Sequence, residues 1–226
     1  MTSKRAILVI GGSGSLGKAV TAAALDRGLT VALAGRDLAK LELLGIKNVD
    51  GTPAKCFQVD LRQPESVSRC AADIKGRLPA LSGVINCAAG FYKGNFASMS
   101  QENIVDLIAT TFTGIVLLIN RLLPTLTDNA PSDIINVTSI SSATTLDTSK
   151  SSSLHIAAKS GLHTFDAVLG RELASASVRV TTVAPGTFAK ENRDGIPVTI
   201  LADLIVKLLE IPSSIRIETL IISPNG

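Results

Sequence analysis

ILVIGGSGSLG, at residues 7–17, joins a run of four apolar residues to a turn with four glycines in seven positions. Apolar residues then recur at helical spacing over residues 15–27. A strand that passes through a glycine-rich turn into a helix presents backbone N–H groups to a phosphate, and the small residues let the phosphate approach. The segment predicts the start of a nucleotide-binding unit, with a plain tight turn between strand and helix as the alternative.

Short apolar runs and longer amphipathic stretches alternate along the rest of the chain. Runs that are apolar at nearly every position suit strands buried on both faces of a parallel sheet. The sequence therefore predicts an α/β fold in which helices cover both faces of a doubly wound parallel sheet. Strands are predicted at residues 7–10, 30–34, 56–59, 83–86, 134–137, 178–183 and 217–222, and helices at 15–27, 38–44, 64–75, 101–126, 154–175 and 198–209.

The composition is that of one soluble domain. With 226 residues, 46% of them hydrophobic, the chain can bury a sizeable core, and we expect a single domain over residues 1–226. The formal net charge of +3 is spread along the chain without a basic run, which argues against a nucleic-acid partner. We expect no membrane-spanning segment, no signal peptide and a cytoplasmic location. The mean hydropathy of +0.36 favours a homo-oligomer.

Cysteine and histidine spacing predicts neither a disulfide framework nor a metal site. Cys56, Cys70 and Cys87 form an odd set without close pairing, so we expect reduced, buried thiols. His155 and His163 lie two helical turns apart with no ligating carboxylate nearby, and His163 is expected in the core.

The end of the second predicted strand, Gly35-Arg36-Asp37, bears on the choice of cofactor. An acid at this strand end would bind the ribose hydroxyls of NAD, but Gly35 has no side chain. The guanidinium of Arg36 can pair with a 2'-phosphate, which favours NADP, whereas the alternative is a solvated arginine. Asp37 directly precedes a predicted helix and is expected to cap it.

Taken in order along the chain, these features resemble the short-chain dehydrogenase/reductase family, whose members have a single-domain Rossmann fold. Gly11 and Gly17 match the outer glycines of the family's loop, although Ile10 and Ser15 depart from its pattern. Further matches are the aspartate after the third strand, the Asn-Cys-Ala-Ala-Gly segment at residues 86–90, in which Asn86 or Gly90 could anchor the alignment, and the Pro-Gly-Thr segment at 185–187. The cofactor-binding residues that the resemblance implies are Gly11, Ser13, Gly14, Ser15, Leu16, Gly17, Arg36, Asp60, Leu61, Asn86, Ala88, Ala89, Lys159, Pro185, Gly186 and Thr187.

The resemblance also implies a catalytic set of Ser139, His155 and Lys159. Ser139 follows a strand end that is similar to the one bearing the family's catalytic serine, and Ser141 and Ser142 are alternatives. The family's Tyr-x-x-x-Lys motif aligns with residues 155–159, so that a histidine stands in place of the catalytic tyrosine. Thr111 stands where the family often has an active-site asparagine. A short substrate loop is expected at about residues 187–197.

Carbonyl reduction needs an acid within hydrogen-bond reach of the substrate oxygen. His155 titrates near neutral pH and is the provisional acid, although Lys159 disfavours its charged form; the alternative is that His155 only packs at a helix start. Tyr92, the only tyrosine, is a second candidate acid or a pocket wall. Ser139 would polarise the carbonyl, and Lys159 would bind the nicotinamide ribose.

These residues predict an NADP-dependent oxidoreductase that transfers hydride between NADP(H) and a carbonyl, alcohol or activated double bond of a small molecule. One rival is an NADP-binding protein with little turnover that acts as a sensor or interaction partner. A structural subunit without nucleotide is a third interpretation.

Overall fold

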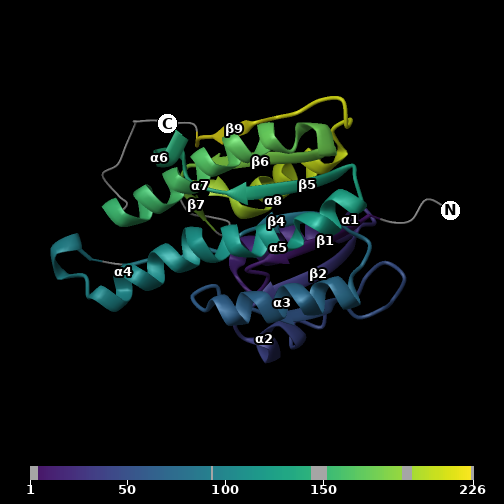
Figure 1. Ribbon diagram of the computed structural model, residues 1–226, viewed down its shortest axis with the longest axis horizontal. Helices are drawn as coiled ribbons and strands as arrows, with labels where there is room; N and C mark the ends of the chain where they lie inside the picture. The colour runs from purple at the N-terminus through teal and green to yellow at the C-terminus, as the bar shows by residue number, and fades with distance from the viewer. Residues whose placement is uncertain (1–4, 93, 144–151, 190–194, 225–226) are drawn as a thin grey trace.

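The protein is a seven-stranded parallel sheet between two layers of helices (Figure 1). The computed structural model describes residues 5–92, 94–143, 152–189 and 195–224. The strand order is β3-β2-β1-β4-β5-β6-β9, and every neighbouring pair is parallel. The strands are β1 (Ala6–Ile10), β2 (Thr30–Gly35), β3 (Lys55–Gln58), β4 (Leu81–Asn86), β5 (Ser132–Val137), β6 (Val178–Pro185) and β9 (Thr219–Ile222).

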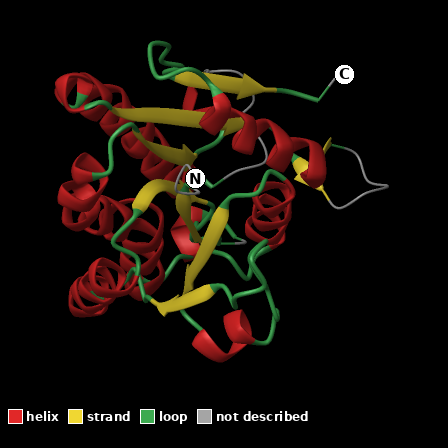
Figure 2. Ribbon diagram, turned by 90° about the vertical axis from the view of Figure 1, so that its right-hand side faces the viewer, coloured by secondary structure: helices red, strands yellow, loops and turns green. Residues whose placement is uncertain are grey.

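Both faces of the sheet are covered, as the apolar runs predict (Figure 2). Successive residues of a strand point to opposite faces. In β1, Ile7 and Val9 pack with α1 (Ser15–Asp26) and α8 (Val198–Lys207), whereas Leu8 and Ile10 pack with the other layer. That other layer consists of α3 (Pro64–Arg77), α5 (Gly114–Asp128) and α7 (Ser153–Glu172). The predicted doubly wound Rossmann fold is confirmed.

The strand order reverses between β1 and β4, which lie side by side at the centre of the sheet. In open α/β sheets, ligands bind at the carboxyl ends of the strands where the order reverses. The glycine turn at residues 11–14 lies at the carboxyl end of β1, and the segment at residues 87–90 follows β4. The topology therefore places two of the predicted cofactor segments next to each other.

The predicted helix at residues 101–126 is interrupted in the structure. It consists of α4 (Gln101–Ile108), one π-helical turn η2 (Ala109–Thr113) and α5, and Figure 1 shows α4 continuing the line of α5 beyond the sheet. Such single π turns occur frequently at functional sites. This turn contains Thr111, which is fully buried.

The stretch Gln101–Asp128 is also long and apolar enough to cross a membrane by length and composition alone, since an 18-residue window within it has a mean hydropathy of 1.6. One such helix is weak evidence for a membrane span. The core helix of a soluble protein passes the same test, and here Ile115, Leu118 and Leu122 are fully buried against the sheet.

Gly114 lets α5 approach the loop after β3. A Cβ atom added at Gly114 would lie 2.1 Å from the carbonyl oxygen of Leu61. A side chain at this position is therefore incompatible with the packing. Because Leu61 belongs to the predicted cofactor site, the close approach of α5 also fixes the wall of that site.

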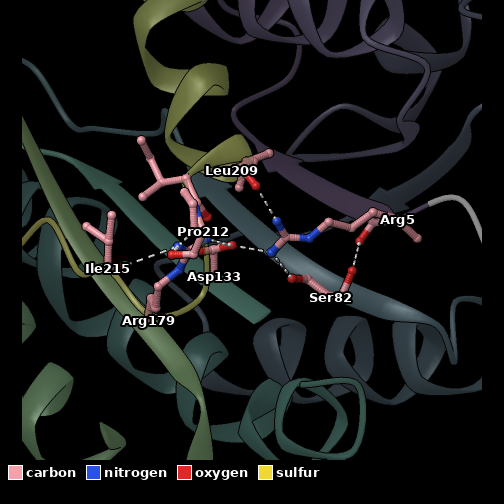
Figure 3. A network of polar contacts seen from close by, with 9 residues as sticks. Arg5, Ser82, Asp133, Arg179, Leu209, Pro212 and Ile215 are labelled. Atoms are coloured by element: carbon pink, nitrogen blue, oxygen red, sulfur yellow. Dashed lines mark hydrogen bonds and ion pairs between the residues drawn. The ribbon is translucent and has the colours of Figure 1, made fainter. Parts of the chain in front are cut away.

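An ion cluster lies at the opposite, amino-terminal edge of the sheet (Figure 3). Asp133, at the start of β5, accepts hydrogen bonds from Arg5 and Arg179. The two guanidiniums also donate to the carbonyl oxygens of residues 82, 209, 211, 212 and 215. The cluster thus ties the segment after α8 to the central strands.

Two segments extend beyond the described residues. The segment after β5 begins with a short helix, α6 (Ile140–Ala143), and residues 144–151 lie outside the description. The substrate loop expected at about 187–197 is bracketed by β7 (Phe188–Ala189) and β8 (Ile196–Pro197), which pair with each other. Its residues 190–194 lie outside the description.

Candidate active site

A cavity of about 580 Å³ lies at the carboxyl ends of β1, β2, β3 and β4. Its size is within the range of sites for small molecules and cofactors. Seven of the predicted cofactor residues line it: Gly11, Ser13, Gly14, Arg36, Leu61, Ala88 and Ala89.

The glycine turn is built to hold an anion. Gly11 has φ +78°, and its N–H donates to the Ala34 carbonyl at 2.8 Å, which closes the turn against β2. Helix α1 starts at Ser15 without a side-chain cap and without an acidic residue in its first turn. The amides of Ser15, Leu16 and Gly17 have no acceptor within the helix, so they can bind a phosphate.

Arg36 lines the cavity at the end of β2, and its side chain is exposed. Asp37 follows it, but its carboxylate accepts a hydrogen bond from the backbone N–H of Lys40 at 2.9 Å and caps α2 (Leu38–Glu42). The prediction that Asp37 is a helix cap is confirmed. Lys40 also lines the cavity, so two cations face this end of it.

Asp60 is held by an arginine that the sequence reasoning missed. Arg62 donates to both carboxylate oxygens of Asp60 and to Asp106 of α4 at 2.8 Å. The Arg62 hydrogen bond holds the pKa of the Asp60 carboxyl below its usual value. Arg62 and Asp106 line the cavity, whereas Asp60 does not. Arg62 therefore forms the part of the cavity wall at which the resemblance implies Asp60.

Asn86 supports the cofactor segment from beneath. It is fully buried at the end of β4, and its Oδ1 accepts the Ala88 N–H at 3.0 Å. Its Nδ2 donates to Asn136 on β5, also at 3.0 Å. Asn86 does not border the cavity; it fixes the backbone of Ala88, which does.

Lys159 is buried on α7 and reaches the end of β5. Its Nζ donates to the Val137 carbonyl, two residues before Ser139. Burial lowers the pKa of Lys159 to about 8. The structure thus places the ammonium at the strand end that carries the predicted catalytic serine.

His155 lies one helical turn before Lys159 and faces the segment after β4. Its Nδ1 is 3.0 Å from the Gly90 carbonyl oxygen, and its ring makes an edge contact with Phe91. A carbonyl only accepts, so Nδ1 carries the proton and the neutral ring keeps Nε2 as an acceptor. Burial lowers the pKa of His155, and the Lys159 charge lowers it further.

Ser139 starts the turn that leads into α6. Its Oγ accepts the Ser141 N–H at 3.3 Å, and the Ser142 hydroxyl donates to the Ser139 carbonyl at 2.6 Å. Both hydroxyls are thus engaged in the backbone of the turn, and neither residue borders the cavity in the described part of the chain.

Thr111 is coupled to the same region from the π turn. Its Oγ1 accepts the Gly90 N–H at 2.9 Å, so Gly90 is held through its N–H by Thr111 and through its carbonyl by His155. The segment above the cavity is therefore fixed from two helices.

Other predicted residues lie away from the cavity. Pro185 ends β6, and Gly186 and Thr187 follow it. None of the three borders the cavity in the described part of the chain, and the Gly186 N–H donates to the Ile222 carbonyl at 2.8 Å. Tyr92 lines the cavity, and its hydroxyl donates to the Ser98 carbonyl at 3.2 Å.

The three cysteines and His163 differ in how far they are buried. Burial raises the pKa values of Cys70 and Cys87 to about 12, so both thiols are neutral at physiological pH. Cys56 and Cys87 are nevertheless only half-buried as residues, unlike the expectation. His163 is half-buried rather than in the core and contacts the Ser142 carbonyl and the Thr219 hydroxyl.

Comparisons with known proteins show the family of the chain. A family model described as short chain dehydrogenase matches residues 5–197. An uncharacterized oxidoreductase of Staphylococcus aureus (strain MW2) is 25% identical over 232 residues, covering 99% of this chain and 98% of the relative. One of Staphylococcus saprophyticus is 27% identical over 181 residues, covering 79% and 76%.

Solved structures share the fold. An alcohol dehydrogenase of the archaeon Thermococcus sibiricus, complexed with 5-hydroxy-NADP, has a TM-score of 0.84 at 19% identity, covering 98% of this chain and 97% of that one. A metagenomic short-chain oxidoreductase in complex with NADP has the same TM-score at 22% identity and the same coverage. Because the family model spans most of the chain, the protein belongs to the short-chain dehydrogenase family and is an oxidoreductase of that family.

Proposed function

We propose that the protein transfers hydride between NADP(H) and a small molecule that carries a carbonyl, the corresponding alcohol or an activated double bond. The observation that carries the choice of NADP is the end of β2, where Arg36 and Lys40 line the cavity while the Asp37 carboxylate caps α2. A 2'-phosphate is a dianion that such cations bind through charge-assisted hydrogen bonds. The NADP complexes of two proteins with the same fold support this choice.

The cavity fits the cofactor in size and chemistry. Arg36, which lines the cavity, would hold the 2'-phosphate, and the amides of the first turn of α1 would hold the pyrophosphate. Lys159, which does not line the cavity, would hold the nicotinamide ribose. When bound, NADPH supplies a hydride. Ser139 would hydrogen-bond the carbonyl oxygen of the substrate, and His155 would move the proton at that oxygen.

Replacing Arg36 with alanine is expected to weaken NADPH binding by about 10–100-fold and NADH binding by less than about twofold. A hydrogen bond between charged groups contributes about 1.5–3 kcal/mol, and only NADPH has the phosphate to make it. Calorimetric titration of wild type and variant with each cofactor measures the difference.

The matched control for this variant is Arg69→Ala, which removes an exposed arginine of α3 outside the cavity. It should leave both affinities unchanged. An equal loss of NADPH and NADH binding in Arg36→Ala would rule out the phosphate contact. If wild type binds neither cofactor, the proposed function itself is wrong.

The role of His155 predicts opposite pH profiles in the two reaction directions. Reduction needs a proton on Nε2, which the ring carries only as imidazolium, because Nδ1–H already faces Gly90. Since burial and the Lys159 charge lower the pKa of His155, we expect the reduction rate to fall as pH rises through that lowered pKa, and the oxidation rate to rise. The test is to screen a panel of carbonyl compounds for one that the protein reduces, and then to measure the rates of reduction and of the reverse oxidation from pH 5 to 8.

His155→Tyr should keep NADPH affinity and lose this pH dependence. His163→Gln is the control, because it removes the other histidine of α7 and should keep the profile. A wild-type profile that survives in His155→Tyr would show that His155 is not the proton donor.

A small-molecule substrate, a homo-oligomer and a cytoplasmic location are part of the same proposal. Exposed apolar side chains on α4 and α7, among them Val105 and Val168, support self-association.

A further inference from the structure

Asp166 is a carboxylate in the core beneath the site. It lies on α7, four residues after the fully buried Leu162, and is only 2% exposed. Its Oδ1 accepts from Asn136 of β5 and its Oδ2 accepts from the Thr182 hydroxyl of β6, each at 2.7 Å. Carboxylates are rarely buried without a charged partner, and neither of these two partners is charged.

A chain of hydrogen bonds connects Asp166 to the cavity wall, and every donor in it points toward Asp166. Asn136 donates to Asp166 and accepts from Asn86, which in turn accepts the Ala88 N–H. Such chains strengthen each bond by polarisation. A negative charge on Asp166 therefore orients both amides and holds Ala88 in place.

The cation on the same face of α7 as Asp166 is Lys159. Lys159 and Asp166 are seven residues apart on α7, which puts them on the same face of the helix two turns apart. Their side chains converge on adjacent residues of β5, because Lys159 reaches the Val137 carbonyl and Asp166 binds Asn136. Lys159 is itself only 3% exposed.

We propose that Asp166 is a positioning residue: it is the buried counter-charge that keeps the Lys159 ammonium protonated, and it anchors the Asn136–Asn86–Ala88 chain below the cofactor. The role of Asp166 as counter-charge to Lys159 concerns this chain alone, whereas the effect of Asp166 on cofactor binding rests on the proposed function.

The titration of the two groups sets the pH range in which the counter-charge acts. Burial raises the pKa of Asp166 to about 7, and burial lowers that of Lys159 to about 8, while the Asp166 charge opposes the lowering. Above about pH 7 Asp166 is ionised and stabilises the ammonium; below about pH 6 it is protonated and does not. The counter-charge therefore acts from neutral to mildly alkaline pH.

Other titratable groups near the pair do not supply this charge. Cys87 faces Lys159 from the segment after β4, and burial keeps its thiol neutral. His155, one turn before Lys159 on α7, is neutral or positive. Asp106 of α4 is paired with Arg62. The elements α6 and η2, which pack on α7, contain no titratable side chain.

Asp166→Asn tests the charge with little change in shape. The amide oxygen can still accept from Asn136, and its NH₂ can donate to the Thr182 hydroxyl, which rotates to accept. We expect the pKa of Lys159 to fall by on the order of one unit. NMR titration of the lysine Nζ signals, with that of Lys159 identified by its loss in Lys159→Met, measures this without cofactor.

The cofactor measurement is calorimetry with NADPH at two pH values. If Lys159 must be charged to bind the ribose, Asp166→Asn should weaken NADPH binding about fivefold at pH 8, where the charged fraction drops from about one half to about one tenth. At pH 6 the two proteins should bind equally. Glu172→Gln, which removes an exposed acid from the same helix, should match wild type at both pH values.

Either outcome of the NMR titration is decisive. An unchanged Lys159 pKa in Asp166→Asn would overturn the proposal even if NADPH binds. A shifted pKa without any NADPH binding would leave the counter-charge intact and reject the proposed function. If the variant does not fold, the wild-type Lys159 signal must show a second inflection where Asp166 titrates, and a single transition would overturn the proposal.

Discussion

Gly17→Ala is expected to weaken NADPH binding by about 10–100-fold while the protein stays folded. A Cβ atom at this position would lie 2.2 Å from the Gly11 carbonyl oxygen and 2.9 Å from the Cα of Gly12. Backbone atoms cannot rotate away as a side chain can, so either the turn or the start of α1 must move. Overpacking of this kind typically lowers stability by about 1–3 kcal/mol. When the strain is relieved by moving the turn out of its binding conformation, a similar free energy is lost from binding, where each 1.4 kcal/mol is about tenfold in affinity.

The displacement falls on the groups that would bind the phosphates. The Gly11 carbonyl accepts the Gly14 N–H at 2.9 Å, so a shift of this oxygen reshapes the whole turn. The amides at the start of α1 would then no longer converge on one point. Calorimetric titration with NADPH, together with circular dichroism to verify folding, measures the effect.

Gly76→Ala is the matched control, because Gly76 lies in α3 and an added Cβ would have no atom within 4 Å. This change should leave NADPH affinity unaltered and stabilise the protein by up to about 1 kcal/mol, since alanine favours helix. NADPH affinity within about twofold of wild type in Gly17→Ala would mean that the turn does not contact the cofactor.

The fold could be predicted because its signals are local. The apolar run at residues 7–10 lies in β1, and the predicted strand at 178–183 lies in β6, since buried parallel strands need continuous apolar sequence. The break at η2 could not be predicted in this way. The residues of the turn, ATTFT, fit the helical spacing on either side, and only packing decides whether a helix has a π turn there.

The site could be predicted where one short segment carries the chemistry. The glycine turn and Arg36 do line the cavity, because each follows directly from the end of a strand. Arg62 was missed because its role depends on Asp106, 44 residues further along the chain. The contact between His155 and Gly90 spans 65 residues and equally has no local signal.

The burial of Asp166 could have been predicted from the sequence. It continues the spacing of Lys159 and Leu162 along the buried face of α7, so helical periodicity alone places an acid in the core. A charged residue at a core position indicates a special environment. What periodicity could not supply is the partner set, since Asn136 and Thr182 come from two different strands.

Asp133→Asn is expected to destabilise the protein by about 3–5 kcal/mol, the usual effect of removing one partner from a buried ion pair. The Asp133 side chain is 5% exposed, and the guanidiniums that bind it, those of Arg5 and Arg179, are 22% and 12% exposed. Without the carboxylate, two cations would face each other in a poorly hydrated region (Figure 3). For a chain of this length, the melting temperature should fall by roughly 10 °C.

The loss should be largest around the segment that the arginines hold. Arg179 donates to the carbonyl oxygens of Ile211, Pro212 and Ile215, and Arg5 donates to that of Leu209. When Asp133 no longer orients the guanidiniums, these carbonyls lose their donors. Hydrogen exchange should therefore accelerate at residues 208–217 more than in β1 or β2, while NADPH affinity stays unchanged because the cavity lies at the opposite edge of the sheet.

Asp73→Asn provides the comparison for charge removal alone. Asp73 pairs with Arg77 at 2.9 Å on the exposed face of α3, where both side chains are almost half exposed. Exposed pairs contribute about 0–1 kcal/mol, so thermal unfolding should shift by a few degrees at most. Equal melting temperatures for the Asp133 and Asp73 variants would show that the cluster in Figure 3 is no more stabilising than a surface pair. In that case the segment after α8 is held by the packing of Leu208 and Leu209 in the core, and not by the two arginines.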